Sequence, residues 1–257
     1  MQITERVILG PLTKKMYHGA SWVGEDEFPL SQEWADEVER VLSFLEAQGQ
    51  FGRYLPTLQG KLGQRDGALA EARVAFFFDR NGFKIVSWEP QGASSQLGEF
   101  EVQWDSLQPI FIEVKGPRWE GELSKDELNG PRRYQPRYIH GEARWIGSIR
   151  KVIAAADKAA SKFLSDRPNL LVVVGYLLFV SPSDFPRGII EPRITNALSD
   201  SRFQNIGGLL IFDFAHDAKP ISYHAAFIEN TTANELCKIP KEVAKGLSMA
   251  NEKVFKR

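Results

Sequence analysis

The stretch PIFIEVKGP, from Pro109 to Pro117, is the part of the sequence around which the fold can be inferred. Its core is apolar and mostly β-branched or aromatic, which is typical of a buried β-strand. Glu113 and Lys115 interrupt this core two residues apart, and alternate residues of a strand point to the same face of a sheet. The pattern therefore predicts a hydrophobic strand that carries a carboxylate and an ammonium side by side and ends at Gly116.

The composition indicates a globular protein with a substantial core. Of 257 residues, 43% are hydrophobic and 25% are charged, which is the usual balance of such proteins. The net charge is -1, so a nucleic-acid partner would have to be contacted by a local basic patch. The single cysteine, Cys237, excludes internal disulfides and a multi-cysteine zinc site.

The apolar segments predict a cytoplasmic protein without membrane contact. The N-terminal residues lack the apolar run of a signal peptide. The longest apolar run, residues 170–180, is too short to span a bilayer and instead favours a buried strand.

Hydrophobic periodicity predicts alternating helices and strands. Helical spacing is found over residues 31–49, 66–81, 148–164 and 239–249, and from Ile194 onward. Strand patterns are found over residues 83–90, 99–104, 110–115, 170–180, 207–214 and 223–228, and the second and third of these form an expected antiparallel hairpin. The order predicts an α/β sandwich around a mixed sheet.

Three segments are expected along the chain. Residues 1–63 would form an N-terminal helical extension, with one good helix among otherwise irregular chain. Residues 64–182 would form the core, and residues 183–257 would add strands and a helix that complete or extend it.

Several charged residues are expected to converge on this scaffold. Glu99 and Glu101 share one face of their strand, Glu113 and Lys115 share one face of the next, and Glu71 lies on the preceding helix. Taken alone, the Glu113–Lys115 pair would be interpreted as solvated charges on an exposed face. Clustered carboxylates repel one another, and a divalent cation such as Mg²⁺ relieves this repulsion.

This arrangement resembles the PD-(D/E)XK nuclease superfamily. Glu71 stands in LAEARVAFFFDRNGF, GEFEV replaces the usual PDF of the second strand, and EVK, beginning at Glu113, matches (D/E)-x-K on the third. The resemblance covers residues 66–180 and implies a restriction endonuclease-like three-layer sandwich. One departure is that glutamate replaces aspartate at the first acidic position, where Glu99 is the closest match and Glu101 is the alternative.

The resemblance also implies a metal site. Mg²⁺, with Mn²⁺ as a substitute, would be held by the carboxylates of Glu99 (or Glu101) and Glu113 and by the backbone carbonyl of Val114. Glu71 would complete the site through water or a second ion.

Lys115 would then orient or deprotonate the attacking water and stabilise the charge of the phosphorane. The implied function is that of a Mg²⁺-dependent endonuclease acting on DNA, where a homodimer would suit the cutting of two strands. The alternative is a catalytically eroded module of the same fold that binds nucleic acid or a protein partner.

A basic segment follows the third strand and is a candidate surface for nucleic acid. Arginine can bind phosphate through two hydrogen bonds, and aromatic rings stack on unpaired bases. Lys162 would extend the positive face along the helix over residues 148–164, and Tyr134, Tyr138 and Trp145 are interleaved. The alternative is a polar loop without phosphate contacts. The candidate binding residues are Arg132, Arg133, Arg137, Arg144, Lys151 and Lys158.

Overall fold

The computed structural model describes residues 7–21, 32–116, 142–174, 190–215 and 222–249. The chain divides into two compact units, the first containing Met1–Phe76 and the second most of the chain from Phe77 onward. Seven α-helices and six β-strands lie within the described residues. None of these helices is long and apolar enough to cross a membrane.

The first unit contains more helix than the sequence predicted. Helix α2 (Gln32–Ala47) was expected, but α1 (Pro11–Tyr17) and α3 (Phe51–Leu58) fall where irregular chain was expected. The start of α1 is stabilised by a residue distant in sequence. The Glu39 carboxylate accepts hydrogen bonds from the backbone N–H of Leu12 at 3.1 Å and of Thr13 at 2.8 Å. Such a cap satisfies N–H groups that have no partner within the helix, and local patterns do not reveal it.

A buried ion pair joins α2 to α4 (Leu62–Arg80) within the first unit. The Nε and Nη2 of Arg73 each donate to one carboxylate oxygen of Glu37 at 2.8 Å. Glu37 is 3% exposed and Arg73 is 5% exposed. The two parallel hydrogen bonds compensate each buried charge only while its partner is present.

Replacing one partner of this pair is therefore expected to destabilise the protein strongly. Arg73→Met should lower the free energy of unfolding by about 3–5 kcal/mol, because the Glu37 charge stays buried without its partner. The double variant Glu37→Met/Arg73→Met should recover most of that loss. Urea denaturation of the three proteins measures both changes, and equal losses in the single and double variants would contradict the interpretation.

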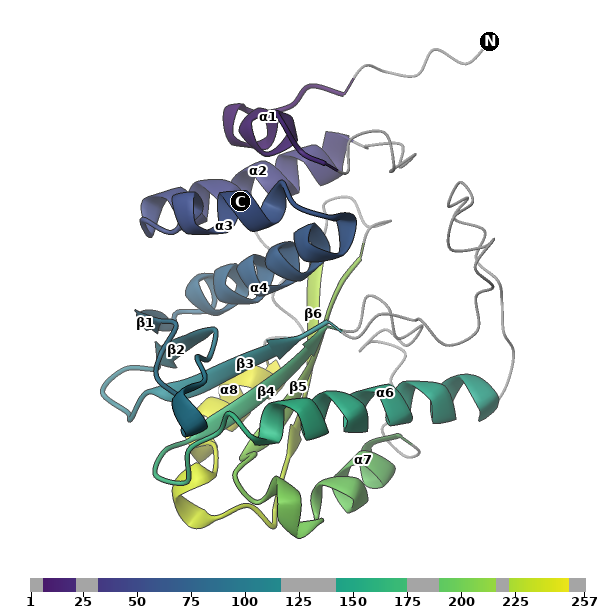
Figure 1. The fold of residues 1–257 in the computed structure, drawn as a ribbon. Coiled ribbons are helices and arrows are strands. Elements are labelled where there is room, and N and C mark those ends of the chain that lie inside the picture. Colours follow the sequence, from purple (N-terminus) through teal and green to yellow (C-terminus); the bar gives the residue numbers. More distant parts are fainter. Residues whose placement is uncertain (1–6, 22–31, 117–141, 175–189, 216–221, 250–257) are drawn as a thin grey trace. The chain divides into compact units, whose positions relative to one another are not determined.

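The second unit is built on a six-stranded mixed sheet (Figure 1). The first three strands form an antiparallel meander, β4 pairs with β3 in parallel, and β5 pairs with β4 in parallel. This topology confirms the predicted α/β class and hairpin, and the C-terminal strands extend the same sheet. In spatial order the strands are β1 (Lys84–Trp88), β2 (Phe100–Gln103), β3 (Ile110–Lys115), β4 (Asn169–Val174), β5 (Gly208–Ala215) and β6 (Ser222–Glu229).

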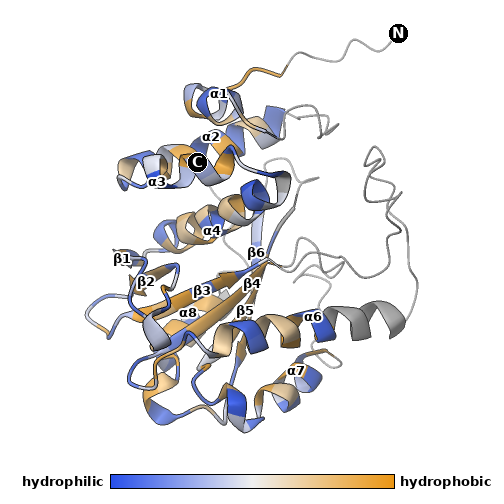
Figure 2. Cartoon of the chain, viewed as in Figure 1, coloured by the Kyte–Doolittle hydropathy of each residue, from blue (hydrophilic) through white to orange (hydrophobic). Residues whose placement is uncertain are grey.

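Apolar side chains cover both faces of this sheet. On one face Phe111, Leu171 and other inward residues form a core with α6 (Glu142–Ala160) and α7 (Ile190–Leu198). On the opposite face Phe100 and Phe212 contact the rings of Phe78 and Phe77, at the end of α4. The central strands are strongly hydrophobic in Figure 2, as expected for strands buried on both faces.

Several helix boundaries differ from the predictions: α4 begins at Leu62 rather than residue 66, and α6 begins at Glu142 rather than residue 148. Helix α6 was expected over residues 148–164 but ends at Ala160, and α7 begins at Ile190 rather than Ile194. The last helix, α8 (Lys241–Met249), lies close to its expected position. The expected cap Ser31 and residues 175–180 of the fourth strand lie outside the described residues.

The starts of β4 and β5 are joined by a close backbone contact. The N–H of Gly207 donates to the carbonyl of Asn169 at 2.9 Å. A Cβ atom at residue 207 would lie 1.8 Å from the carbonyl oxygen of Cys237. Cys237 itself is fully buried, and this burial raises the pKa of its thiol. Only glycine fits residue 207 without moving backbone.

A matched pair of glycine substitutions tests this contact. Gly207→Ala is expected to reduce stability by at least about 1–3 kcal/mol, because the added methyl group overlaps a carbonyl that cannot rotate away. Gly246→Ala, inside α8 with open space around the added methyl group, should instead stabilise by about 0.5–1 kcal/mol. Thermal melting of both variants tests this account, and an unchanged melting temperature for Gly207→Ala would contradict it.

Candidate functional site

Glu113 is a charged residue at the centre of a hydrophobic strand. Its side chain is fully buried, and β3 sets it beside Leu171 of β4. The Lys115 ammonium donates to Oε1 of Glu113. This contact confirms that the two side chains leave the strand on the same face. It also shows that the pair is not a solvated surface pair, because none of the glutamate is exposed.

A second lysine contacts the same carboxylate. Lys162 Nζ lies 2.7 Å from Glu113 Oε1 and 3.8 Å from Glu99 Oε1. The sequence pattern did not predict this role and instead placed Lys162 on the basic face of a helix. That placement is wrong, because α6 ends at Ala160 and Lys162 lies in the turn that follows. Helical spacing continued past this end, so the sequence contained no local signal for the turn.

Glu99 is brought next to Glu113 by the register of the hairpin. Phe100 pairs with Ile112, and the Glu99 N–H donates to the Ile112 carbonyl at 3.2 Å. Continuing this register by one step places Glu99 opposite Glu113, where cross-strand side chains are neighbours on one face. Two carboxylates in this position would repel each other, and the ammonium of Lys162 offsets that repulsion.

The two carboxylate oxygens of Glu113 differ in their contacts. Its Oε2 is buried and has no hydrogen-bond partner among the described residues. A buried carboxylate oxygen in this state is costly, and a cation or a bound water would satisfy it. Mg²⁺ is commonly held by one or two carboxylates together with water and phosphate. The pair Glu99 and Glu113 therefore fits such an ion.

Glu101, the alternative ligand, has a different partner. Its carboxylate accepts a hydrogen bond from Arg167 Nη1 at 2.8 Å. Burial acts to lower the pKa of Arg167, but hydrogen bonds to Asp166 and Glu101 outweigh that effect and raise it. Glu101 is thus engaged by a guanidinium, whereas Glu99 shares Lys162 with Glu113. The geometry favours Glu99 over Glu101.

The two other predicted ligands, Val114 and Glu71, lie on different elements. Val114 follows Glu113 in β3 and is buried. Glu71 lies on α4 in the first unit, whereas the other predicted ligands belong to the second. Its contribution to the site stays a prediction. Within the part of the chain that the structure describes, no group of three or more His, Cys, Asp or Glu residues is close enough to hold a metal.

The loop between β1 and β2 fixes the backbone of Lys162. Ala93 N–H donates to the Lys162 carbonyl at 2.8 Å. A Cβ atom on Gly92 would lie 2.6 Å from the same oxygen, so the approach requires glycine. The loop also carries strained backbone. Positive φ values occur at three of its non-glycine residues, Glu89, Ser94 and Ser95.

The basic candidates are only partly described. Lys151 and Lys158 lie on α6, seven residues and thus about two turns apart, which places them on one face of the helix. Arg144 also belongs to α6, but its side chain lies outside the described residues. Arg132, Arg133 and Arg137 lie outside them entirely. Contact with phosphate therefore stays a prediction for all six.

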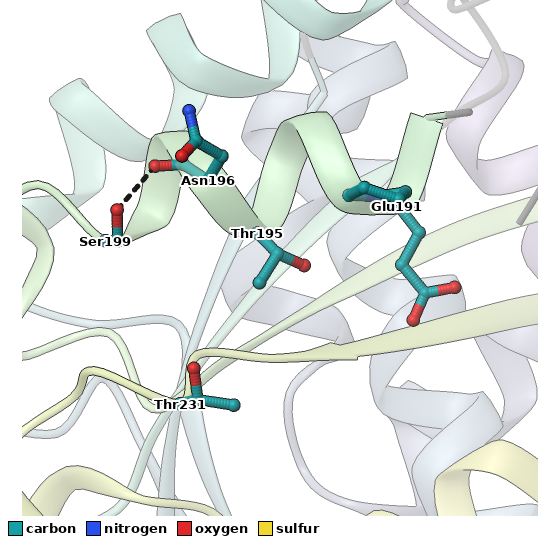
Figure 3. A pocket seen from close by; sticks show the side chains of 6 residues that line it. Glu191, Thr195, Asn196, Ser199 and Thr231 are labelled. Carbon is teal, nitrogen blue, oxygen red and sulfur yellow. Dashed lines mark hydrogen bonds between the residues drawn. The ribbon is translucent and has the colours of Figure 1, made fainter. Parts of the chain in front are cut away.

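A separate depression lies beside α7, between that helix and the chain after β6 (Figure 3). Glu191, Thr195 and Asn196 line it from the helix, and Thr231 lines it from the other side. Glu191 is the one charged residue among the described residues of its lining, so the depression lacks the paired carboxylates and lysines of the Glu113 site.

Comparison with known proteins adds little to this description. No protein-family model matches the sequence, and no curated protein matches it. Among solved structures the chain is similar to Pyrococcus furiosus SfsA in complex with Ca²⁺, at 18% identity and a TM-score of 0.26. The match covers 65% of this chain and 62% of SfsA, so less than two thirds of SfsA is spanned. The sheet and its topology define the chain as an α/β protein.

Glu113 and Glu101, on the two strands of the hairpin, should differ in their importance for folding. Glu113→Gln leaves two ammonium groups without their buried carboxylate and should cost about 2–3 kcal/mol, the lysines being partly solvated. Glu101→Gln breaks a more exposed pair and should cost less than about 1 kcal/mol. Denaturant unfolding of both variants tests this difference, and equal costs would contradict the central position given to Glu113.

Proposed function

We propose that the chain is a metal-dependent nuclease that hydrolyses phosphodiester bonds in DNA. The observation that carries the proposal is the environment of Glu113. A fully buried carboxylate is paired with lysines and lies opposite Glu99, and one of its oxygens has no hydrogen-bond partner in the described part of the chain. The strand order around it, an antiparallel meander followed by a helix and a parallel strand, agrees with the PD-(D/E)XK resemblance.

The proposed ligands of the metal are the carboxylates of Glu99 and Glu113 and the carbonyl of Val114, all within the second unit. When bound, Mg²⁺ or Mn²⁺ would supply Lewis acidity and lower the pKa of a coordinated water. Burial of Glu113 fixes its side chain in the sheet, so this ligand would need little reorganisation on binding.

Lys115 is the proposed catalytic lysine. Its ammonium contacts Glu113 and keeps about a quarter of its surface exposed, so it can reach a substrate without leaving the site. There it would orient the attacking water and offset the negative charge that develops on the phosphorane. The basic residues of the segment after β3 and of α6 would hold the DNA backbone, which would make binding strongly dependent on salt.

A second function is supported by a specific observation. Lys162 already supplies a positive charge to both carboxylates of the site. A chain that relied on this lysine alone would keep its fold without metal and could act as a non-catalytic module. Such a module would bind nucleic acid or a protein partner. Calorimetric titration with Mg²⁺ separates the two, because salt-dependent DNA binding without metal binding would favour the module.

A plasmid-nicking assay tests the nuclease proposal. The wild-type chain is expected to nick supercoiled DNA with Mg²⁺ or Mn²⁺ and to lose this activity in EDTA. Lys115→Ala and Glu113→Gln should each reduce the rate by about 10²–10⁴-fold, because each removes a group at the reacting centre. Lys84→Ala, an exposed lysine of β1, serves as the control and should match wild type.

Two results would overturn the proposal. One is an unchanged nicking rate in Lys115→Ala. The other is the absence of cleavage by the folded wild-type chain on supercoiled, linear and single-stranded DNA with either metal.

A further inference from the structure

We infer that Lys162 is an internal counter-cation of the Glu99–Glu113 site and that a divalent metal binds there only by displacing its ammonium group. This inference rests on the proposed function, because it assumes that the two carboxylates bind Mg²⁺. It goes further by assigning Lys162 a role that the PD-(D/E)XK motif does not include, namely competition with the metal.

The contacts of Lys162 place its charge where a metal would be needed. Its Nζ is 2.7 Å from Glu113 Oε1 and 3.8 Å from Glu99 Oε1, so one ammonium contacts an oxygen of each carboxylate. Mg²⁺ held by both carboxylates would have to approach at least one oxygen of each to about 2.0–2.1 Å. On Glu113 this oxygen would be Oε2 or its neighbour Oε1, and the two share one carbon atom. An ion at that distance and an ammonium in its present position would repel each other strongly in a partly buried site. The carboxylate pair can therefore bind the Lys162 ammonium or the metal ion, but not both at once.

The backbone of Lys162 is held by hydrogen bonds on both sides, whereas its side chain is partly exposed. Its carbonyl accepts from Ala93 N–H at 2.8 Å, and its own N–H donates to the carbonyl of Ala159 at 2.9 Å. The lysine side chain beyond this fixed backbone is flexible and is 21% exposed, so solvent is accessible to the departing ammonium. Lys115 contacts the same Oε1 from within β3. The strand holds Lys115 next to Glu113, whereas Lys162 reaches Glu113 from a turn.

The uneven pairing of Glu113 supports the exchange. Both lysines contact Oε1, whereas Oε2 has no hydrogen-bond partner among the described residues. Displacement of Lys162 would leave Lys115 in place on Oε1 while a metal occupied the space between the carboxylates. The negative charge of the two carboxylates would then be compensated throughout, by Lys162 before the metal binds and by the metal afterwards.

The metal affinity of lysine variants tests the inference. Isothermal titration of the full chain with Mn²⁺ should give a dissociation constant about tenfold lower, or more, for Lys162→Met than for wild type, because the competing charge is removed. Lys162→Arg keeps the charge and should remain within about threefold of wild type. Lys84→Met is the control for loss of a lysine elsewhere and should also match wild type.

A measurement without catalysis gives an independent readout. In EDTA, Lys162→Met should melt at a lower temperature than wild type, because two carboxylates face each other without a shared cation. Added Mn²⁺ should raise its melting temperature by more than that of wild type. Glu99→Gln/Lys162→Met should recover part of the metal-free loss. If Lys162→Met does not fold, Lys162→Gln is used for the same comparisons.

The outcomes distinguish this inference from the nuclease proposal. Equal or weaker Mn²⁺ binding by the uncharged Lys162 variants, or no binding by any variant, overturns the role of Lys162 as a competitor. Tighter binding in those variants without any DNA cleavage supports the inference and contradicts the nuclease. Cleavage by wild type together with an unchanged dissociation constant supports the nuclease and contradicts the inference.

Discussion

The compensation of one buried carboxylate, that of Glu113, is the interaction on which the candidate site depends. An isolated charge in the middle of an apolar strand would cost several kcal/mol. Its compensation comes from Lys115 in the same strand and from Lys162 after α6, and Glu99 is held by the neighbouring strand. The charge can be buried only when the hairpin, the end of α6 and the β1–β2 loop have all assembled, so charge compensation and folding of the second unit are coupled.

The balance of charge at this site connects its two proposed states. Two carboxylates face two ammonium groups, so the four side chains sum to a formal charge of zero when all are ionised. A divalent cation that replaced the Lys162 ammonium would leave two carboxylates, Lys115 and the metal, an excess of one positive charge that a phosphodiester could neutralise. The same cluster could therefore be stable without a ligand and attract a polyanion after metal uptake.

Much of the sheet could be predicted from the sequence because strand geometry is simple. The two-residue period fixed the common face of Glu113 and Lys115, and the hairpin placed Glu99 near them. Helix α1 and the end of α6 could not be predicted, because each depends on a contact with a residue distant in sequence. Glu39 caps α1, and Ala93 binds the turn that contains Lys162. Local periodicity has no information about such contacts, so the second lysine of the site was missed.

The loop between β1 and β2 has a consequence for how this protein can vary. Surface loops usually accept insertions and deletions with little effect on the domain they belong to. This loop leads directly into Glu99 and also anchors the backbone of Lys162 through Ala93 and the close approach of Gly92. A change of even one residue in its length would shift an anion and a cation of the site together. Tolerance of length changes should therefore be low here, although the segment has the outward features of an ordinary connection.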